Sequence, residues 1–201
     1  MKKIILASMS IDRKEILKRA GISFEIFAPD VNENEYKKKI SDPILLVKEL
    51  AKAKALNVKK KLSNGKKDLI IISADTIVEF QGKIIGKANN EEDAFIMIKF
   101  LKNQTHNLIT GIAITEIGGE KLIVDYEIYK VCFSDLSDEE IHFYVKTGEW
   151  KGRAGSYSIR DKASLFVKYI DGSSSNVIGL PMHKVFEILK NDFNFDLLKF
   201  R

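Results

Sequence analysis

A single carboxylate interrupts the most apolar stretch of this 201-residue chain. Asp75 follows residues 70–74, which are apolar apart from Ser73, and precedes residues 76–78, which are apolar apart from Thr76. Aspartate is disfavoured in strands, and a buried carboxylate must be paired, protonated or bound to a metal. The pattern therefore predicts a metal ligand or a general base at the wall of a cleft. The alternative is an Asx turn that ends the strand, which the apolar residues after Asp75 disfavour.

Two hydroxyls and one arginine lie where a short apolar run gives way to helical spacing: Ser8, Ser10 and Arg13. Free backbone N–H groups and the helix dipole make such a junction attractive to anions, and these side chains could hold a phosphate there. The alternative is an ordinary N-cap beside a solvated arginine. The sequence contains neither a P-loop pattern nor GxGxxG, so classical dinucleotide binding is unsupported.

Three further charged residues could take part in such a site. Glu33 lies in a polar segment and is solvated if it acts alone, but Mg²⁺ binds through one or two carboxylates plus substrate phosphates, so a second acid would suffice. Lys54 lies among alanines on a predicted helix, and Lys87 follows a short predicted strand. Either could neutralise phosphate charge. A solvated surface position is the alternative for both lysines.

The remaining polar features carry less chemistry. Residues 152–160 and 172–181 are rich in glycine or serine, and long polar loops of this kind in compact domains are often functional. His106, His142 and His183 lack the spacing of a metal site, and we interpret them as structural or solvated. The single Cys132 excludes an internal disulfide and any metal site built from several cysteines.

Alternating strands and helices must position these residues. Predicted strands cover 3–7, 22–28, 69–78, 83–85, 108–117, 122–133 and 165–170. Predicted helices cover the stretch from residue 11 to Gly21, then 43–62, 91–101 and 137–147 (the last begun by a capping box), and a final one opens near Pro181. Residues 30–42 are polar and predict no element. The interleaving predicts the α/β class, and two hairpins make the sheet mixed.

Composition narrows the function classes. The net charge is +5 from 33 basic and 28 acidic residues, but most of the basic residues are lysines spread along the chain. That pattern does not favour a specific nucleic-acid site, which would need an arginine-rich face with interleaved aromatic residues. The N-terminal apolar run is too short for a secretion signal, and no apolar stretch approaches the ~20 residues of a membrane span. We expect a cytoplasmic protein with no membrane partner.

Taken together, these segments resemble the Maf family of nucleoside triphosphate pyrophosphatases. The resemblance rests on stretches that occur in the family's order over nearly the whole chain: 6–13, 29–33, 54–55, 73–78, 86–87, His106 with 110–111, 148–149, 154–157 and 176–181. It implies one domain over residues 1–201 with two lobes around a central cleft, built on an elongated twisted sheet and similar to inosine triphosphatase. It also implies metal-dependent hydrolysis of a nucleoside triphosphate to the monophosphate and pyrophosphate, with Mg²⁺ or Mn²⁺ as cofactor. A homodimer is a family-level expectation.

The resemblance also assigns roles to residues. Asp75 matches the proposed general base, and Glu33 and Asp75 match the acids that hold the metal. Lys54 and Lys87 match catalytic lysines that neutralise phosphate. The substrate-binding matches are Ser8, Ser10, Arg13, Thr76 and Arg160, of which the last three correspond to positions linked to base selection.

Two departures bear on substrate choice. The family branch that acts on dTTP and UTP has Gln at position 160, and the branch that acts on 7-methylguanosine triphosphate favours Glu; arginine, unlike either, carries donors only. Lys87 is followed by Ala88 where the family usually has proline. We expect dTTP, UTP or a modified pyrimidine nucleotide as substrate. The alternatives are a 7-methyl-GTP pyrophosphatase, or a nucleotide- or nucleic-acid-binding regulator of cell division without catalytic activity.

Overall fold

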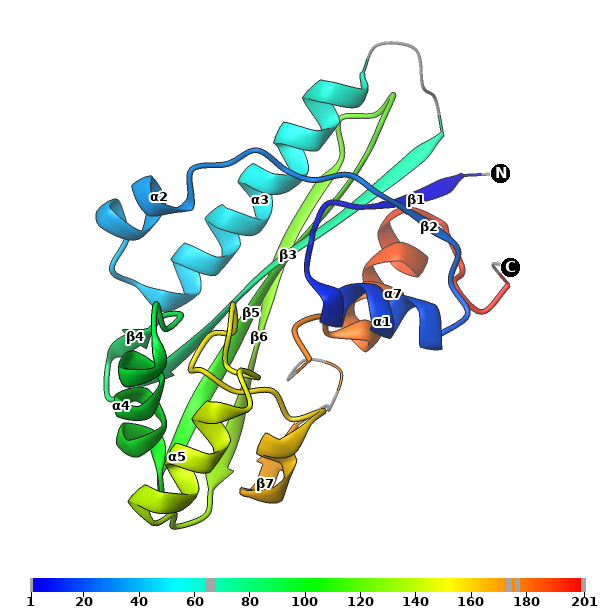
Figure 1. The fold of residues 1–201 in the computed structure, drawn as a ribbon. Helices are drawn as coiled ribbons and strands as arrows, with labels where there is room; N and C mark the ends of the chain where they lie inside the picture. The colour runs from blue at the N-terminus through cyan, green and yellow to red at the C-terminus, as the bar shows by residue number, and fades with distance from the viewer. Residues whose placement is uncertain (1, 64–67, 173–174, 176–177, 200–201) are drawn as a thin grey trace. The chain divides into compact units, whose positions relative to one another are not determined.

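The computed structural model describes residues 2–63, 68–172, 175 and 178–199. Helices and strands are interleaved along these residues (Figure 1). The order is β1 (Lys3–Leu6), α1 (Ile11–Arg19), β2 (Phe24–Ile26), α2 (Glu33–Lys39), α3 (Pro43–Leu62), β3 (Leu69–Phe80), β4 (Lys83–Ile85), α4 (Glu91–Leu101), β5 (Thr105–Glu116), β6 (Leu122–Phe133), α5 (Asp138–Lys146), the 3-10 helix η1 (Lys162–Leu165), β7 (Val167–Asp171) and α7 (Met182–Asp192). Across the described ranges, we find no helix with the length and apolar character that a membrane crossing requires.

The strands form one mixed sheet, which confirms the predicted α/β class. Its order is β2-β1-β3-β5-β6-β7, with β4 paired to β3 outside this path. Strand β1 lies parallel to both β2 and β3, whereas β4 lies antiparallel to β3 and β7 lies antiparallel to β6. Gln81 and Gly82 join β3 to β4 with φ angles of 52° and 77°, the left-handed pair that a two-residue hairpin turn requires.

Most predicted elements are confirmed, and the differences lie in polar segments. Residues 33–39 form a helix where the sequence predicted no element. The predicted strand 22–28 shortens to β2, and the predicted strand 165–170 is divided between η1 and β7. Pro181 stands one residue before α7 and acts as its N-cap residue. The sequence Asn64-Gly65 predicts the end of the helix 43–62, but these two residues lie outside the described residues, as does part of the loop 172–181.

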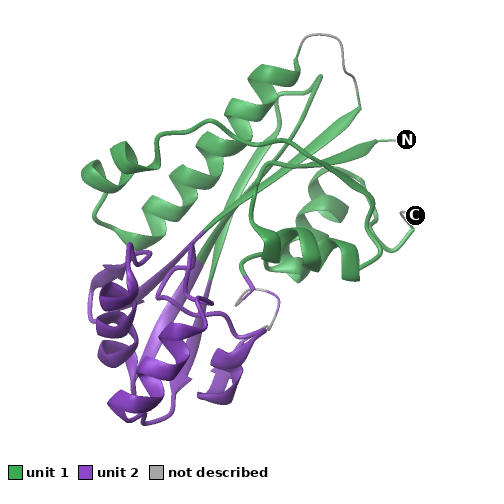
Figure 2. Cartoon of the chain, in the orientation of Figure 1, with its two compact units in different colours: residues 1–75, 110–127, 179–201 green, residues 76–109, 128–178 purple. Residues whose placement is uncertain are grey.

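The chain divides into two compact units (Figure 2). Unit 1 comprises residues 1–75, 110–127 and 179–201, and unit 2 comprises residues 76–109 and 128–178. The expectation of one domain whose two lobes close on a cleft stays a prediction.

In unit 1, α3 packs against the sheet through small and branched side chains. Its inward residues include Ala51, Ala55 and Val58, which share a buried cluster with Ile71 of β3 and Ala113 of β5. Gly111 permits the close approach, since a Cβ atom at that position would lie 2.3 Å from the backbone oxygen of Val47 on α3. The helix that carries Lys54 is thereby fixed close to the sheet.

In unit 2, the core is aromatic. The rings of His106, Phe133, Tyr157 and Phe166 meet edge to face with centroid separations of 4.8 to 5.4 Å. The imidazole Nε2 of His106 lies 2.8 Å from the Tyr157 hydroxyl. This confirms a structural role for His106 and ties β5 to the polar segment that follows α5.

Candidate active site

The ammonium group of Lys54 lies between two carboxylates in unit 1. Its Nζ atom is 2.6 Å from Oδ1 of Asp75 and 2.6 Å from Oε1 of Glu33. The side chains of Lys54 and Asp75 are only 9% and 10% exposed, whereas that of Glu33 is 35% exposed, so solvent reaches the cluster at Glu33. Asp75 lies within β3, and the Asx-turn alternative is therefore wrong.

The packing of α3 on β3 brings Lys54 to Asp75. The hydroxyl of Ser73 donates a 2.6 Å hydrogen bond to the backbone carbonyl of Ala51. Ser73 and Asp75 are two residues apart and point to the same face of β3, while Ala51 and Lys54 are three residues apart and lie on one face of α3. The serine bond and the ion pair are therefore successive contacts along the same line between strand and helix.

Glu33 reaches the cluster from the first turn of α2. The helix dipole favours a carboxylate at this end, and Asn32 is the N-cap residue. The second carboxylate oxygen of Glu33 lies 3.6 Å from Nζ of Lys37, one turn along the same helix. A solvated Glu33 was expected only if this residue acted alone. The structure instead pairs Glu33 with the ammonium of Lys54, which also contacts Asp75.

Arg13 forms a second buried cation in unit 1. Its Nε donates a 2.8 Å hydrogen bond to the carbonyl of Gly179, and its Nη1 donates a 3.0 Å bond to the Ser8 hydroxyl. Burial lowers the pKa of Arg13, while the negative charges of Asp75, Glu33 and Asp12 act in the opposite direction. The two carboxylates of the Lys54 cluster are thus among the charges that oppose the lowering of the Arg13 pKa.

The strand-to-helix junction contains the N-cap of the alternative interpretation. Ser10 is the N-cap residue of α1, and its hydroxyl accepts a hydrogen bond from the backbone N–H of Arg13 at 3.5 Å. Ser8 is buried, and its hydroxyl also accepts from the N–H of Ser10 at 3.2 Å. The junction thus combines the cap with a buried arginine, and the alternative of a solvated Arg13 is wrong.

The other three predicted site residues belong to unit 2. Thr76 directly follows Asp75 on β3 and is half-buried. Lys87 is exposed, and its backbone forms an antiparallel bridge with Ala154. A 2.9 Å hydrogen bond from the N–H of Gly155 to the carbonyl of Gly86 strengthens this pairing. Two of the stretches that carry the family resemblance, 86–87 and 154–157, therefore lie side by side within this unit.

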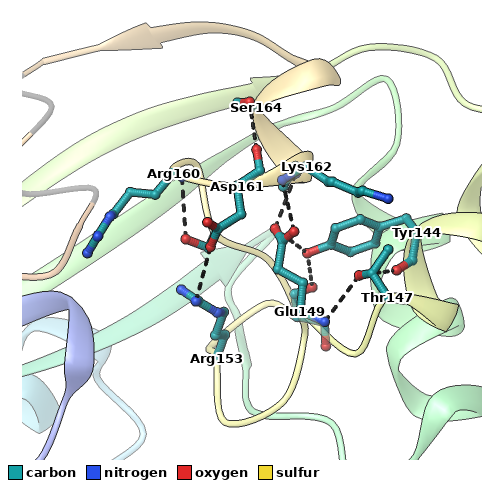
Figure 3. A network of polar contacts seen from close by, with 11 residues as sticks. Tyr144, Thr147, Glu149, Arg153, Arg160, Asp161, Lys162 and Ser164 are labelled. Carbon is teal, nitrogen blue, oxygen red and sulfur yellow. Dashed lines mark hydrogen bonds and ion pairs between the residues drawn. The ribbon is translucent and has the colours of Figure 1, made fainter.

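A half-buried carboxylate, that of Glu149, holds in place the segment that directly follows Arg160 (Figure 3). Glu149 accepts hydrogen bonds from the backbone N–H of Lys162 at 2.8 Å and of Ala163 at 3.2 Å, at the start of η1. Its Oε1 also accepts from the Tyr144 hydroxyl at 3.3 Å. The Arg160 side chain points away from this network in Figure 3.

Two of these partners were missed by the sequence reasoning. The carbonyl of Gly179 is 166 residues from Arg13, and a backbone acceptor leaves no residue-type signal. Glu149 belongs only to one of the stretches that carry the resemblance, 148–149. Glu149 directly follows Gly148 in a segment without regular periodicity. The backbone groups of such a segment need hydrogen-bond partners, and this was the one sequence signal for the role of Glu149.

The Lys54 cluster fits a divalent metal by its donor set. Glu33 and Asp75 offer hard carboxylate oxygens that already converge on one positive charge. Within the described part of the chain, no group of three or more His, Cys, Asp or Glu side chains could hold a metal. A site with two carboxylates would therefore leave coordination positions for water and for oxygens of a bound anion, as Mg²⁺ sites that handle phosphates do.

Known proteins named dTTP/UTP pyrophosphatase are similar to this chain over almost its full length. The chain is 43% identical over 198 residues to the dTTP/UTP pyrophosphatase of Alkaliphilus oremlandii, covering 98% of this chain and all of that protein. It is 42% identical to the protein of the same name from Caldicellulosiruptor saccharolyticus, covering 99% and 98%, and 42% identical to that from Pyrococcus furiosus, covering 94% and 95%.

Solved structures add little at this level of likeness. A dITP/XTP pyrophosphatase from Mycobacterium abscessus is similar at 13% identity with a TM-score of 0.36, covering 65% of this chain and 72% of that one. A score of this size carries no argument about the fold. The family model described as Maf-like protein matches residues 3–192. The chain belongs to the Maf family.

Proposed function

We propose that this protein hydrolyses nucleoside triphosphates between the α- and β-phosphates, releasing a nucleoside monophosphate and pyrophosphate, with dTTP and UTP as substrates. The observation that carries the proposal is the cluster in which Lys54 bridges Asp75 and Glu33. The charges of these two carboxylates also act on the pKa of the buried Arg13. Relatives at 41–43% identity over nearly the whole chain are named dTTP/UTP pyrophosphatases, which supports this substrate class.

The chemistry follows from the charges of these side chains. A water molecule attacks the α-phosphorus, its oxygen forms the new bond, and the bond from that phosphorus to the bridging oxygen breaks. Asp75 accepts the proton from the water, and pyrophosphate leaves with the electron pair of the broken bond. Lys54, Arg13 and the hydroxyls of Ser8 and Ser10 neutralise and orient phosphate oxygens.

Glu33 and Asp75 would hold the divalent cofactor, Mg²⁺ or Mn²⁺. Such an ion neutralises phosphate charge and lowers the pKa of bound water. We propose roles for Lys87 in phosphate binding and for Thr76 and Arg160 in base selection, and these rest on the family resemblance alone.

A pyrophosphate-release assay over canonical and modified nucleoside triphosphates, with Mg²⁺ and with Mn²⁺, tests the proposal. We expect dTTP and UTP to give the highest kcat/KM. Hydrolysis in ¹⁸O-labelled water should place the label in the monophosphate, because attack at the α-phosphorus leaves the water oxygen there. Label in the pyrophosphate would contradict the proposed site of attack, and 7-methyl-GTP as the best substrate would favour the other family branch.

Two variants connect the activity to the cluster. Asp75→Asn should lower kcat by about 10²- to 10⁴-fold because the amide cannot accept the proton. Asp30→Asn, at a side chain that is 87% exposed, should leave turnover unchanged. Full turnover by Asp75→Asn would refute the role of Asp75. Binding of nucleotides with no hydrolysis of any by the unaltered protein would favour the regulator alternative.

A further inference from the structure

We infer that the ammonium of Lys54 occupies the place of the divalent cation between Glu33 and Asp75, so that the lysine and the metal compete for the same two carboxylates. Metal binding is then weak until a triphosphate gives Lys54 another anionic partner. The competition itself needs no catalytic activity, whereas the release of Lys54 onto a triphosphate rests on the proposed function.

The contact geometry carries the first step. The ammonium has three N–H donors, and carboxylate oxygens at 2.6 Å on two sides engage two of them. A metal that binds Oδ1 of Asp75 and Oε1 of Glu33 takes the same oxygens. It would then stand within a few ångströms of an ammonium that protein atoms almost enclose, where repulsion is weakly screened. One cation must leave before the other binds.

The surrounding charges carry the second step. Lys37 lies 3.6 Å from the other oxygen of Glu33. The ammonium groups of Lys54 and Lys37 thus balance the carboxylates of Asp75 and Glu33. A dication that arrives alone adds uncompensated positive charge to this set. A triphosphate brings negative charge with the metal, and its oxygens can accept the hydrogen bonds that Lys54 gives up.

Titration with Mn²⁺ in the absence of nucleotide tests the competition, with free Mn²⁺ measured by its EPR signal. Lys54→Met should bind Mn²⁺ about tenfold more tightly than the unaltered protein, or tighter still, because the competing charge is gone. Lys54→Gln, which keeps a polar partner for the carboxylates, should also bind more tightly. Lys54→Arg retains the positive charge and should not.

The matched control is Lys37→Met. This variant removes the same formal charge from beside Glu33 but leaves Lys54 between the two carboxylates. The native Lys37 side chain is 41% exposed. Its Mn²⁺ affinity should stay within about threefold of the unaltered protein, since solvent screens exposed charges. Equal or weaker Mn²⁺ binding by both neutral Lys54 variants, with circular dichroism showing that they fold, would overturn the inference.

A second arm measures the coupling to the anion, with a non-hydrolysable α,β-imido analogue of dUTP as the probe. The analogue should tighten Mn²⁺ binding to the unaltered protein and tighten it less in Lys54→Met, where no ammonium has to be displaced. Equal tightening in both proteins would contradict the coupling. Because the metal-only titration requires no turnover, it stands if the pyrophosphate-release assay fails, so the two hypotheses can be refuted separately.

Discussion

The hydroxyl of Ser73 donates a hydrogen bond of 2.6 Å to the carbonyl of Ala51, and this bond fixes α3 to β3 directly beside the ion pair of Lys54 with Asp75. The same hydroxyl lies 3.2 Å from the carbonyl of Ala113 on β5. One fully buried serine therefore joins the helix to two strands of unit 1.

Ser73→Ala should lower the free energy of unfolding by about 1 kcal/mol, the usual contribution of an intramolecular hydrogen bond. It should also lower kcat, because the helix that positions Lys54 loses its anchor to β3. Urea unfolding measures the first effect, and the pyrophosphate-release assay measures the second. Ser63→Ala is the control, since the exposed Ser63 hydroxyl donates to a helix carbonyl at the same distance of 2.6 Å. Equal losses of stability in the two variants would refute a special role for Ser73.

Glu149→Ala should loosen the loop that leads to η1. The variant removes the charged acceptor of the backbone N–H groups of Lys162 and Ala163, and such charge-assisted bonds are stronger than neutral ones. Hydrogen exchange at these two amides should accelerate by about tenfold, which corresponds to about 1.4 kcal/mol. Glu139→Ala, at an exposed acid in the first turn of α5, should leave both rates unchanged. Unchanged exchange in Glu149→Ala would show that other contacts hold the loop.

Protonation of His106 should destabilise the protein in mild acid. Burial lowers its pKa to about 4, and its Nδ1 has no hydrogen-bond partner among the described residues. In the unfolded chain the imidazole titrates near pH 6.5. Between these values the unfolded state binds more protons, so the free energy of unfolding falls as the pH falls from 6.5 to 4. The contribution of His106 between pH 7 and pH 5 is about 2 kcal/mol.

Urea unfolding at pH 7 and pH 5 measures this dependence. His106→Gln can keep a hydrogen bond to Tyr157 but cannot titrate, and it should lose most of the His106 contribution even if it is less stable at pH 7. His142→Gln, at an exposed residue whose ring stacks on Phe95, should keep the full dependence. An NMR titration in which the His106 imidazole protonates near pH 6.5 in the folded protein would contradict the prediction.

The sequence predicts the elements wherever apolar residues repeat with a clear period, and it misses those without one. Helix α3 begins and ends at the predicted residues because its inward positions recur at helical spacing. Helix α2 has no buried residue, so no apolar pattern marks its seven polar and charged residues. Its contact with the rest of unit 1 includes the ion pair of Glu33 with Lys54, which forms only in the folded chain.

The candidate site divides in the same way. Asp75 is predictable because a carboxylate within an apolar strand must be paired, protonated or bound to a metal. Lys54 is not distinguishable from the many other lysines by sequence pattern, since its partner on β3 is 21 residues away and meets it only through helix packing. The buried state of Arg13 depends in the same way on the distant carbonyl of Gly179. Residue type and spacing indicate the chemistry, whereas burial and pairing depend on tertiary contacts.

Arg160→Gln should change which base the enzyme prefers. Arginine offers only donors, whereas glutamine offers a donor and an acceptor, so the variant can pair with both the N–H and the carbonyl groups of a thymine or uracil edge. We expect kcat/KM for dTTP and UTP to rise against that for 7-methyl-GTP by about tenfold, the scale of one well-placed hydrogen bond. The change should lie mainly in KM, since we propose that residue 160 contacts the base and not the reacting phosphate.

The control for Arg160→Gln is Arg19→Gln at the exposed end of α1, which removes the same charge from unit 1 and should leave the substrate ranking unchanged. Combining Glu149→Ala with Arg160→Gln adds a further test, because Glu149 holds the segment directly after residue 160. If Arg160 must be held in place to contact the base, Glu149→Ala alone should reduce the ratio of kcat/KM values between the preferred and the other nucleotides. The same change should have a smaller effect on this ratio in a protein that already carries Arg160→Gln. A ranking that Arg160→Gln leaves unchanged would exclude position 160 from base selection.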